Sequence, residues 1–499
     1  MIFLTRPIAG GLTGLFLSGA LACSAGSPAT STTRGSGGGG NTSPGTLNVG
    51  GSNAGNSGLN VSVAGSGNTG SGTLTDCGSG PPTSLSGTVY DPAGAVPLYN
   101  VVLFVPGEAL SPITTGAACQ TCDGDFSGKP QAVALSDSAG HFEIDNVPAG
   151  DNIPLVIQVG KWRREVTIAH VNACMDNAIM DKDMTRLPRN QTEGNIPHIA
   201  VALGGSDSLE CLLRRIGVDD SEFTPPDQGG RVHLYRWGDN AATTMQVNGA
   251  SSPVPTADTL WGNLDALMAY DLMLLSCTGE SKLGTETVDY QNVRAYADKG
   301  GRIFGSHWHN DWIRTDADTV SDPLWYPQVV KFSSGAHGFT DPFTAQIDVS
   351  FPKGMSFRDW LTNVGASTTP GQIVIQGAEH SIDSVLPKAL MDPAVPTYAA
   401  GPGAQQWIYG TDTTLSTPTP TVQYFSMNTP VAGAECGRMV FSDLHVSTGS
   451  GDTTKVPFPT GCSSSPLTPQ EKALEFMLFD LSSCVQSDQD PPVPPVVVK

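Results

Sequence analysis

The chain has 499 residues, including 58 glycines and 38 prolines, and only 15% of its residues are charged. Lys and Arg total 26 against 47 Asp and Glu, which gives a formal net charge of −21 at pH 7. This length predicts about three domains. The composition is typical of loop-rich, β-containing extracellular modules and argues against a coiled coil or a compact helical enzyme. The acidic balance, without a basic stripe, excludes nucleic acid as a partner.

The first residues predict export. Arg6 precedes an uncharged run of small and aliphatic residues that is too short to span a bilayer, as in a signal peptide. Residues 20–23 read Ala-Leu-Ala-Cys, which resembles a bacterial lipobox. The resemblance implies removal of residues 1–22, a lipid on Cys23 that anchors the protein to a membrane, and sorting to the outer membrane or cell surface. An ordinary secretory signal ending in Ala-Leu-Ala is the alternative.

Residues 23–80 predict a disordered tether behind the lipidated cysteine. Between Gly35 and Thr75 no residue is charged, and Gly, Ser, Asn and Thr dominate. Such a segment cannot bury enough apolar surface to offset the entropy lost on ordering it. At the other end of the chain, residues 486–499 are rich in proline and predict a loose tail.

Cysteine usage is also typical of an exported protein. Once Cys23 is set aside, nine cysteines remain, which allows at most four disulfides and leaves one thiol. Cys119 and Cys122 form a CxxC in a Gly/Asp-rich loop, and a zinc or thioredoxin-like site requires a different context. A disulfide within this loop is therefore expected, and Cys436 and Cys462 are further candidates for disulfides.

Residues 81–170 predict a small β-sandwich, because short apolar runs alternate with Gly, Pro and Asp turns. The ordered set SGTVYDPAG, VPLYNVVLFVP, SDSAGHFEIDNVPAG and LVIQVGKW resembles the carboxypeptidase regulatory-like, transthyretin-like domain. The resemblance implies a stalk or binding module with a carbohydrate-binding-like fold. It implies no peptidase activity, because the metallopeptidase domain is absent. The expected strands are 84–91, 101–105, 141–144 and 154–159.

Residues 190–485 predict an α/β domain with a β-rich insert at about 315–435. Apolar strands alternate with apolar-striped helices, which indicates right-handed crossovers and a parallel sheet. Asp207 and Glu210 predict a capping pair for the first helix, and residues 468–471 predict a capping box for the last. The expected strands are 199–203, 231–235, 271–276, 302–305 and 437–442, with 346–351, 372–376 and 421–428 in the insert.

Segments 270–276, 300–307 and 437–445 resemble the class I glutamine amidotransferase-like fold, a flavodoxin-like α/β fold, including its ThuA-like relatives. In glutaminases of this fold, the nucleophilic cysteine lies in the turn after the strand equivalent to 302–305. Here that turn reads Ser-His-Trp-His, so the resemblance implies a domain that does not hydrolyse glutamine. Cys277 is not expected to replace the nucleophile, because it follows the preceding strand.

Polar side chains follow two of the expected strands. His307 and His309 follow one, and Asp443 and His445 follow another. The carboxyl ends of parallel strands meet at one edge of a sheet, where ligands bind. The patterns HxH and DxH offer imidazole and carboxylate ligands for a divalent metal. These four residues are therefore the candidate metal or catalytic site, with Glu280 nearby.

Aromatic side chains beside these histidines offer a second interpretation of the same edge. Trp308 and Trp312 present planar apolar faces that suit sugar rings, as do Trp325 and Tyr326 further along. The alternative is purely structural: the polar side chains hydrogen-bond loop backbone and the tryptophans cover the edge of the sheet.

The sequence leaves two main functions open, beside a third in which the chain is a scaffold whose acidic surface recognises a partner. The first is a lipid-anchored cell-surface protein with a non-catalytic binding or structural role, whose ligand is a glycan or an envelope protein and which needs no cofactor. The second is a carbohydrate-active or metal-dependent hydrolase or isomerase that uses His307, His309 and His445 with a divalent metal. The sequence favours the first, because it lacks both the nucleophile and the peptidase domain.

Overall fold

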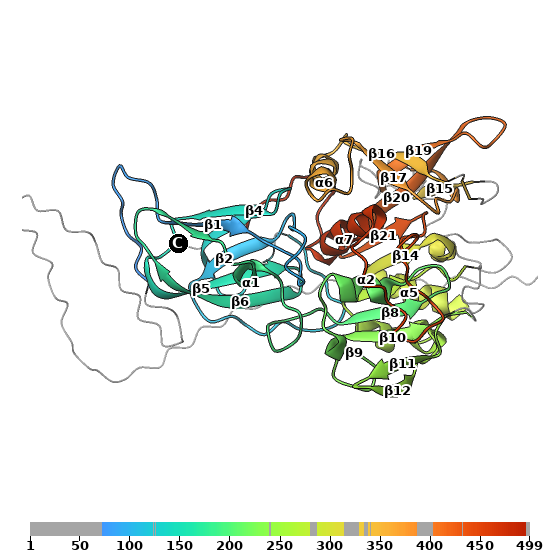
Figure 1. The fold of residues 1–499 in the computed structure, drawn as a ribbon, viewed down its shortest axis with the longest axis horizontal. Coiled ribbons are helices and arrows are strands. Elements are labelled where there is room, and N and C mark those ends of the chain that lie inside the picture. Colours follow the sequence, from blue (N-terminus) through green and yellow to red (C-terminus); the bar gives the residue numbers. More distant parts are fainter. Residues whose placement is uncertain are drawn as a thin grey trace, which may run out of the picture. The chain divides into compact units, whose positions relative to one another are not determined.

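The computed structural model describes residues 72–122, 124, 126–238, 241–279, 287–313, 329–333, 338–339, 341–386, 403–431 and 433–495. The predicted signal peptide, Cys23, Glu280, Trp325 and Tyr326 lie outside these ranges. The described residues form a β-sandwich followed by an α/β region, and strands outnumber helices in them (Figure 1). No helix in these ranges is long and apolar enough to cross a membrane.

The sandwich consists of two sheets whose inner faces share one core. A three-stranded sheet has the order β4-β1-β7, and a four-stranded sheet has the order β3-β2-β5-β6. Inward-facing residues such as Leu85, Phe142 and Ile157 are fully or almost fully buried. The strands expected from sequence correspond to β1, β2, β4 and β5, whereas β3, β6 and β7 were not predicted. The bounds are β1 Ser84–Thr88, β2 Val102–Pro106, β3 Pro130–Leu135, β4 His141–Asp145, β5 Gly150–Val159, β6 Trp162–Val171 and β7 Asp176–Ile179, with the short helix α1 at Lys182–Thr185.

A ten-stranded sheet organises the α/β region. Six neighbouring strands, in the order β21-β14-β13-β8-β10-β9, run parallel. When the edge strand β9 is left out and the other five parallel strands are numbered in chain order, their order in the sheet is 2-1-3-4-5. This order is common in doubly wound sheets. The five strands predicted from sequence are all present in the parallel half. The bounds are β8 Ile199–Leu203, β9 Phe223–Thr224, β10 Val232–Arg236, β13 Leu272–Leu275, β14 Arg302–Ser306 and β21 Gly437–Ser442.

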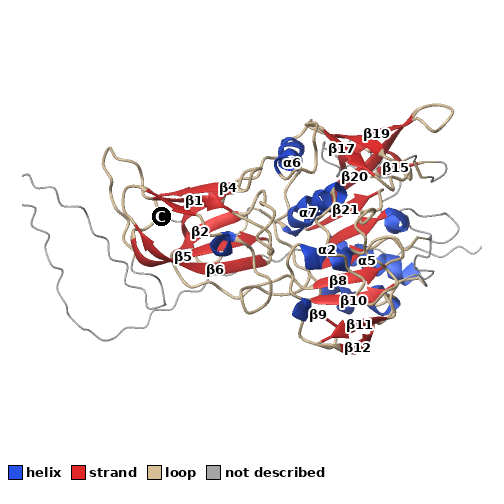
Figure 2. Cartoon of the chain, in the orientation of Figure 1, coloured by secondary structure: helices blue, strands red, loops and turns tan. Residues whose placement is uncertain are grey.

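Helices cover both faces of the parallel half (Figure 2). Along β8, Val201 joins the core shared with α2 and α7, whereas Ala202 joins the core shared with α3, α4 and α5. This alternation follows from the two-residue period of a strand and explains why every residue of β8 is apolar and buried. The bounds are α2 Leu209–Arg215, α3 Asp258–Trp261, α4 Leu264–Met268, α5 Thr287–Asp298 and α7 Pro469–Ser482, with 3-10 turns η1 Asp220–Glu222 and η2 His307–Trp312.

The insert extends the same sheet with antiparallel strands. β20 pairs with β21, and β19, β16 and β17 follow outward. The expected strand 346–351 is wrong in its second half, because the chain turns there into the unpredicted helix α6. The bounds are β16 Phe343–Ile347, α6 Pro352–Asn363, β17 Gln372–Ile375, β19 Gln405–Asp412 and β20 Thr419–Thr429; two small sheets contain β11 Thr244–Val247 with β12 Ala250–Pro253, and β15 Val330–Phe332 with β18 Ile382–Val385.

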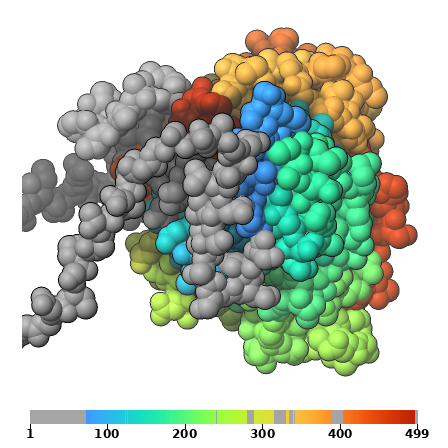
Figure 3. Space-filling view, turned by 90° about the vertical axis from the view of Figure 1, so that its left-hand side faces the viewer, coloured from blue at the N-terminus to red at the C-terminus, as the bar shows by residue number. Residues whose placement is uncertain are grey.

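The sandwich packs on the α/β region through a continuous apolar core and through polar contacts. Trp162 of β6 contacts Phe479 of α7, with ring centroids 5.8 Å apart. Where α6 borders the sandwich, Trp360 Nε1 donates to the carbonyl of Pro97 at 2.7 Å. Figure 3 shows this border as orange residues of the insert next to blue and green residues of the sandwich.

Four disulfides join segments that are far apart in the sequence, and Cys277 is the free thiol among the described residues. The predicted disulfide between Cys119 and Cys122 is wrong, because each of these cysteines pairs with the α/β region instead. Their loop lies against that region, so both sulfur atoms face partners there. The pairs are Cys77–Cys174, Cys119–Cys436, Cys122–Cys484 and Cys211–Cys462.

The two predicted helix caps have different outcomes. The capping box of α7 is confirmed: Thr468 Oγ1 accepts from the N–H of Glu471, and the Glu471 carboxylate accepts from the N–H of Thr468. The capping pair of α2 is wrong. Its N-cap is Ser208, which makes no side-chain cap bond, and the carboxylate of Asp207 is used elsewhere.

Candidate functional site

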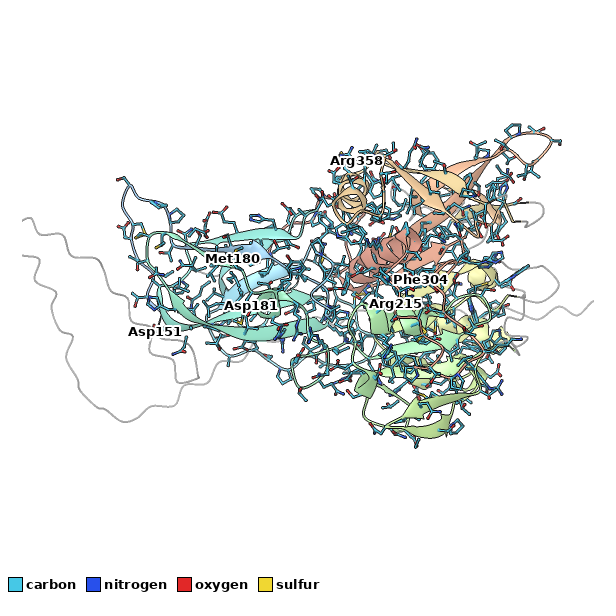
Figure 4. All side chains as sticks on the ribbon, in the orientation of Figure 1. Asp151, Met180, Asp181, Arg215, Phe304 and Arg358 are labelled. Carbon is cyan, nitrogen blue, oxygen red and sulfur yellow. A yellow bond between two sulfur atoms is a disulfide. The ribbon has the colours of Figure 1, made fainter. Side chains whose placement is uncertain are left out.

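At the carboxyl ends of three neighbouring parallel strands lie three side chains of types that bind metal ions. Cys277 follows β13, His307 follows β14 directly, and His445 follows β21. Because β14 lies between β13 and β21, the three side chains come from adjacent positions of one edge. Figure 4 labels Phe304, which marks β14 two residues before this edge. The site also borders the switch point between β8 and β13, where doubly wound sheets bind ligands.

The three side chains converge. Sγ of Cys277 lies 3.6 Å from Nδ1 of His307 and 3.5 Å from Nε2 of His445. All three of these ligand atoms lie within 4.8 Å of one another. No other group of at least three His, Cys, Asp or Glu side chains converges in this way within the described ranges. We call Cys277, His307 and His445 the Cys–His–His cluster.

The backbone of His307 has an unusual conformation. Its φ is +37°, a region that side chains other than glycine seldom occupy, and such conformations cost on the order of 1–3 kcal/mol. The strand ends at Ser306, and this conformation starts the 3-10 turn η2 at His307. The imidazole is almost fully buried, and its Nε2 has no hydrogen-bond partner. A strained residue with an unsatisfied buried nitrogen is a strong indication of a functional position.

The protonation of the cluster follows from its burial. Burial, with a smaller contribution from Asp207, raises the pKa of the Cys277 thiol to about 12. Burial, together with the neighbouring imidazoles, lowers the pKa of His307 to about 3. Near neutral pH the thiol therefore keeps its proton and the His307 ring is neutral. This is the opposite of the thiolate–imidazolium pair that activates cysteine nucleophiles.

One buried carboxylate connects the loops that carry the cluster. Oδ2 of Asp207, in the loop after β8, accepts from the N–H of Cys277 at 3.2 Å and from Ser306 Oγ at 2.5 Å. Its Oδ1 accepts from the N–H of Ser447 at 3.1 Å. Cys277, the residue before His307 and a residue two positions after His445 are thus held by one side chain. Asp207 therefore fixes the relative positions of all three ligand loops.

Two further carboxyl groups lie close to the cluster. Oε2 of Glu379, in the turn after β17, is 3.9 Å from Nε2 of His307. The Glu379 backbone is fixed, because its N–H donates to the carbonyl of Asp443 at 2.8 Å and its carbonyl accepts from Gln423. Asp443 is fully buried, and its Oδ2 accepts from the N–H of Ser381 at 2.6 Å. Burial raises the pKa of Asp443 to about 7.

The structure separates the other predicted residues from the cluster. His309 is fully buried and points to the backbone: its Nε2 lies 3.0 Å from the carbonyl of Ser276, and its Nδ1 accepts from Trp312 at 3.0 Å. Trp312 packs among Trp261 and Tyr290 in the core. These two residues have the structural role. Of the predicted residues, His307 and His445 belong to the cluster. Asp443 contacts Glu379 through the backbone hydrogen bond described above. The ring centroid of Trp308 is 4.9 Å from that of His307.

Sequence reasoning missed three residues of the site: Cys277, Asp207 and Glu379. Cys277 was excluded because it follows a different strand from the expected nucleophile, but β13 and β14 are neighbours, so the thiol still reaches His307. A signal for Cys277 was present, since a serine ends or directly follows each of the three strands and a Cys or His follows within three residues. Glu379 carried no such signal, because it belongs to the insert.

Comparisons with known proteins do not assign the chain to a family. No family model matches, and no curated protein matches. Two solved structures of type II cohesin–X-dockerin complexes from Acetivibrio cellulolyticus are similar to part of it. The C-terminal interface mutant is 17% identical with a TM-score of 0.14, covering 29% of this chain and 75% of that one. The N-terminal interface mutant is 15% identical with a TM-score of 0.15, covering 28% and 85%. Scores this low do not establish a shared fold.

Proposed function

We propose that this chain is an exported metalloprotein in which Cys277, His307 and His445 bind one zinc-like divalent ion, and that the bound ion activates water for hydrolysis. The distances within the cluster carry the proposal. An ideal tetrahedral zinc site has Zn–S of about 2.3 Å and Zn–N of about 2.0–2.1 Å, which places sulfur and nitrogen about 3.5 Å apart. The two sulfur–nitrogen distances here are 3.5 and 3.6 Å.

The number of ligands favours a catalytic over a structural centre. Structural zinc sites use four protein ligands, whereas catalytic sites use three and leave the fourth position to water. The cluster supplies three ligands. A zinc-bound water loses its proton near neutral pH and becomes a nucleophile. An ion held by Cys277, His307 and His445 would thus supply a water whose hydroxide could add to the electrophilic atom of a substrate, while the water's other proton would pass to the leaving group.

Glu379 supports this proposal as the neighbour of a metal-binding histidine. Histidine ligands usually direct their second ring nitrogen to a carboxylate, which orients the ring and increases its basicity. With Nδ1 of His307 facing the sulfur, Nε2 faces the Glu379 carboxylate at 3.9 Å.

A cysteine nucleophile is the competing function for the same residues, and two observations disfavour it. The thiol lies at similar distances from two imidazoles, which is unnecessary for a single general base. The raised pKa of the thiol also opposes thiolate formation without a cation. A non-catalytic binding role for the sandwich remains compatible with a metal centre in the α/β region.

The proposal also includes where the protein is located and which fold its α/β region resembles. Four disulfides are typical of exported proteins, and this supports export. The lipid anchor on Cys23, the cell-surface location and a glycan or envelope-protein ligand for the sandwich rest on the sequence patterns alone. The relation to amidotransferase-like domains is supported by the 2-1-3-4-5 strand order, which is the flavodoxin-like order.

Metal analysis of the purified full-length protein tests the centre. After equilibration with zinc and removal of the excess, we expect about one ion per chain in the wild type. Cys277→Ala and His445→Ala should each weaken zinc binding at least about 100-fold, because two ligands rarely hold zinc. His141→Ala is the matched control, since His141 is exposed on β4 of the sandwich and should have no effect. Equal zinc content in all four proteins would contradict the proposal.

Cobalt substitution tests water activation without requiring a substrate. Cobalt bound by a thiolate and two imidazoles gives a visible spectrum, and deprotonation of a bound water should change it with a midpoint near pH 7. A cobalt spectrum that stays constant between about pH 5.5 and 9 would mean that the ion is held without an ionisable water. In that case the centre is structural and the hydrolase proposal fails, while metal binding stands.

A further inference from the structure

A cavity that is separate from the Cys–His–His cluster lies against the four-stranded sheet of the sandwich. Its volume is about 360 Å³, within the range of small-molecule sites. At about 30 Å³ per water molecule this corresponds to about a dozen waters or a ligand of similar size. None of the residues of the Cys–His–His cluster lines the cavity.

One row of cross-strand neighbours forms the floor of this cavity. Arg163 of β6 pairs with Gln158 of β5, Gln158 pairs with Val102 of β2, and Val102 pairs with Leu135 of β3. All four residues line the cavity and are only partly buried. Their sequence neighbours Leu103 and Ile157 point to the opposite side and are fully buried. The cavity therefore lies on the outer face of the sheet, which in antiparallel sheets usually faces water.

A covalently fixed loop forms a second wall of this cavity, which is partly open to solvent. Residues 111–114 and 119–122 line the cavity, and Cys122 is bonded to Cys484. Backbone hydrogen bonds continue the connection, from the N–H of Cys122 to the carbonyl of Val485 at 3.2 Å and from the N–H of Val485 to the carbonyl of Gln120 at 2.8 Å. The walls are thus held by covalent and main-chain bonds, so binding requires little ordering of the protein.

Among the described residues that line the cavity, Arg163 is the one charged side chain. Its Nη2 donates to the carbonyl of Ser111 at 2.9 Å, and no carboxylate of the described residues forms an ion pair with it. Partial burial lowers the pKa of the Arg163 guanidinium, with Glu165 acting in the opposite direction. In a chain with a net charge of −21, an arginine that forms no ion pair with any described carboxylate is unusual in a cavity. A guanidinium has five donors in a planar fork that matches a carboxylate.

We propose that this cavity binds a small organic carboxylate, with its carboxylate on Arg163 and its body over Val102 and Leu135. Apolar side chains, amides such as those of Gln120 and Gln158, and several serine and threonine hydroxyls line the remaining volume, so the ligand body combines apolar and hydrogen-bonding surface. The site is independent of the proposed metal centre, because the two share no residue.

Calorimetric titration of the full-length protein with charge-matched probe pairs tests the site. Benzoate and glucuronate carry a carboxylate, whereas benzamide and glucose have similar sizes without the charge. We expect at least one carboxylate to bind, and to bind at least about tenfold more tightly than its neutral counterpart, because a charge-assisted bidentate pair is lost without the carboxylate. The titrations are carried out with excess chelator, so that a metal ion cannot supply the anion site.

A pair of neighbouring variants makes the result specific to Arg163. Arg163→Gln should weaken carboxylate binding at least about tenfold and leave the weak binding of the neutral probe unchanged. Arg164→Gln is the matched control: it removes the same charge one residue away, from a side chain that donates to backbone carbonyls outside the cavity. Equal weakening in both variants, equal affinity for charged and neutral probes, or no binding of either carboxylate would overturn the proposal.

Discussion

Two buried polar groups in the α/β region differ in how their charges and hydrogen bonds are satisfied. In the first, Arg438 of β21 and Lys353 of α6 face Asp480 of α7 and Asp488, and the closest nitrogen–oxygen distances are 2.7–2.8 Å. Two cations thus oppose two anions. In the second, the Cys–His–His cluster, two ring nitrogens face one sulfur at 3.5–3.6 Å, and Nε2 of His307 has no hydrogen-bond partner.

This difference indicates a structural role for the ionic group and a functional role for the Cys–His–His cluster. The ionic group has balanced charge and joins α6, α7, β21 and the segment after α7; Nε of Arg438 has no hydrogen-bond partner, but its guanidinium is neutralised by Asp480 and Asp488. The cluster has comparable burial but no opposed charges, and a divalent cation would bind its three ligand atoms, Cys277 Sγ, His307 Nδ1 and His445 Nε2, while Nε2 of His307 is left facing Glu379. Buried polar atoms without partners are uncommon in native proteins, and each requires an explanation.

The largest expected effect comes from breaking the ionic group. Arg438→Met should lower the free energy of unfolding by about 3–5 kcal/mol, because it leaves Asp480 and Asp488 with a single cation in a buried environment. Urea unfolding followed by fluorescence measures the change. Arg358→Met is the matched control: this arginine pairs with Asp359 at the surface of α6 (Figure 4), where the expected loss is below about 1 kcal/mol. Similar losses of unfolding free energy in both variants would show that the buried ionic group stabilises the fold no more than a surface ion pair does.

Removing metal should have the next largest effect, and it should act on the cluster alone. At a free zinc concentration of about 100 times Kd, binding stabilises the native state by about 2.7 kcal/mol. A chelator should therefore lower the stability of the wild type by about this amount. It should leave Cys277→Ala unchanged, because that variant has already lost the ion. A chelator effect of equal size in both proteins would place the stabilising ion elsewhere.

The parallel half of the fold was predictable because its signals are local. Strands such as Ile199–Leu203 and Gly437–Ser442 are short apolar runs that end in turns, and the Thr468 capping box marks the start of α7 within four residues. The insert was less predictable, since β16 and β19 obtain their positions from pairing with distant strands. The helix α6 was missed because the expected strand ran to Phe351, directly before the helix begins at Pro352, and Gly354 weakens the helical pattern.

The candidate site was half predictable for the same reason. His307 and His445 could be selected because each follows a recognisable strand. Cys277 follows an equally clear strand, but its relevance depends on β13 lying beside β14, which is a property of strand order. The pairing of Cys119 with Cys436 depends on how the sandwich packs against the α/β region. Neither fact is contained in a local pattern.

Asp207 sharpens the comparison, because it is a buried carboxylate that serves the cluster without being a ligand. An amide at this position accepts through one oxygen only, so Asp207→Asn should lose one of the bonds to Cys277 and Ser447. We expect zinc affinity to fall about 10- to 100-fold. The cobalt spectrum per bound ion should keep its thiolate band, since the ligands are unchanged. Asp137→Asn, in a turn of the sandwich, is the control, and loss of the thiolate band would instead make Asp207 a ligand-determining residue.

The smallest expected effect concerns a third buried arrangement, a pair of carboxyl groups where the sandwich meets α7. Asp91 and Glu475 face each other; burial raises the pKa of Asp91 to about 6, and burial and the Asp91 charge raise that of Glu475. Lys182 and Lys472 are nearby cations that oppose these shifts. Because the folded state holds protons that the unfolded state releases, stability is highest below about pH 4 for these groups and falls as pH rises through their folded pKa values.

Glu475→Gln removes the proton-dependent partner while keeping the shape of the side chain. The variant should lose about 1–2 kcal/mol less stability than the wild type between pH 5 and pH 8, because an amide does not titrate and the raised pKa of Glu475 then no longer contributes to the loss. Urea unfolding at three pH values measures this difference. Glu143→Gln, an exposed residue on β4, is the matched control and should follow the wild type. A Glu475→Gln curve parallel to that of the wild type would show that the pair does not share a proton, and that this junction, unlike the Cys–His–His cluster, is already satisfied.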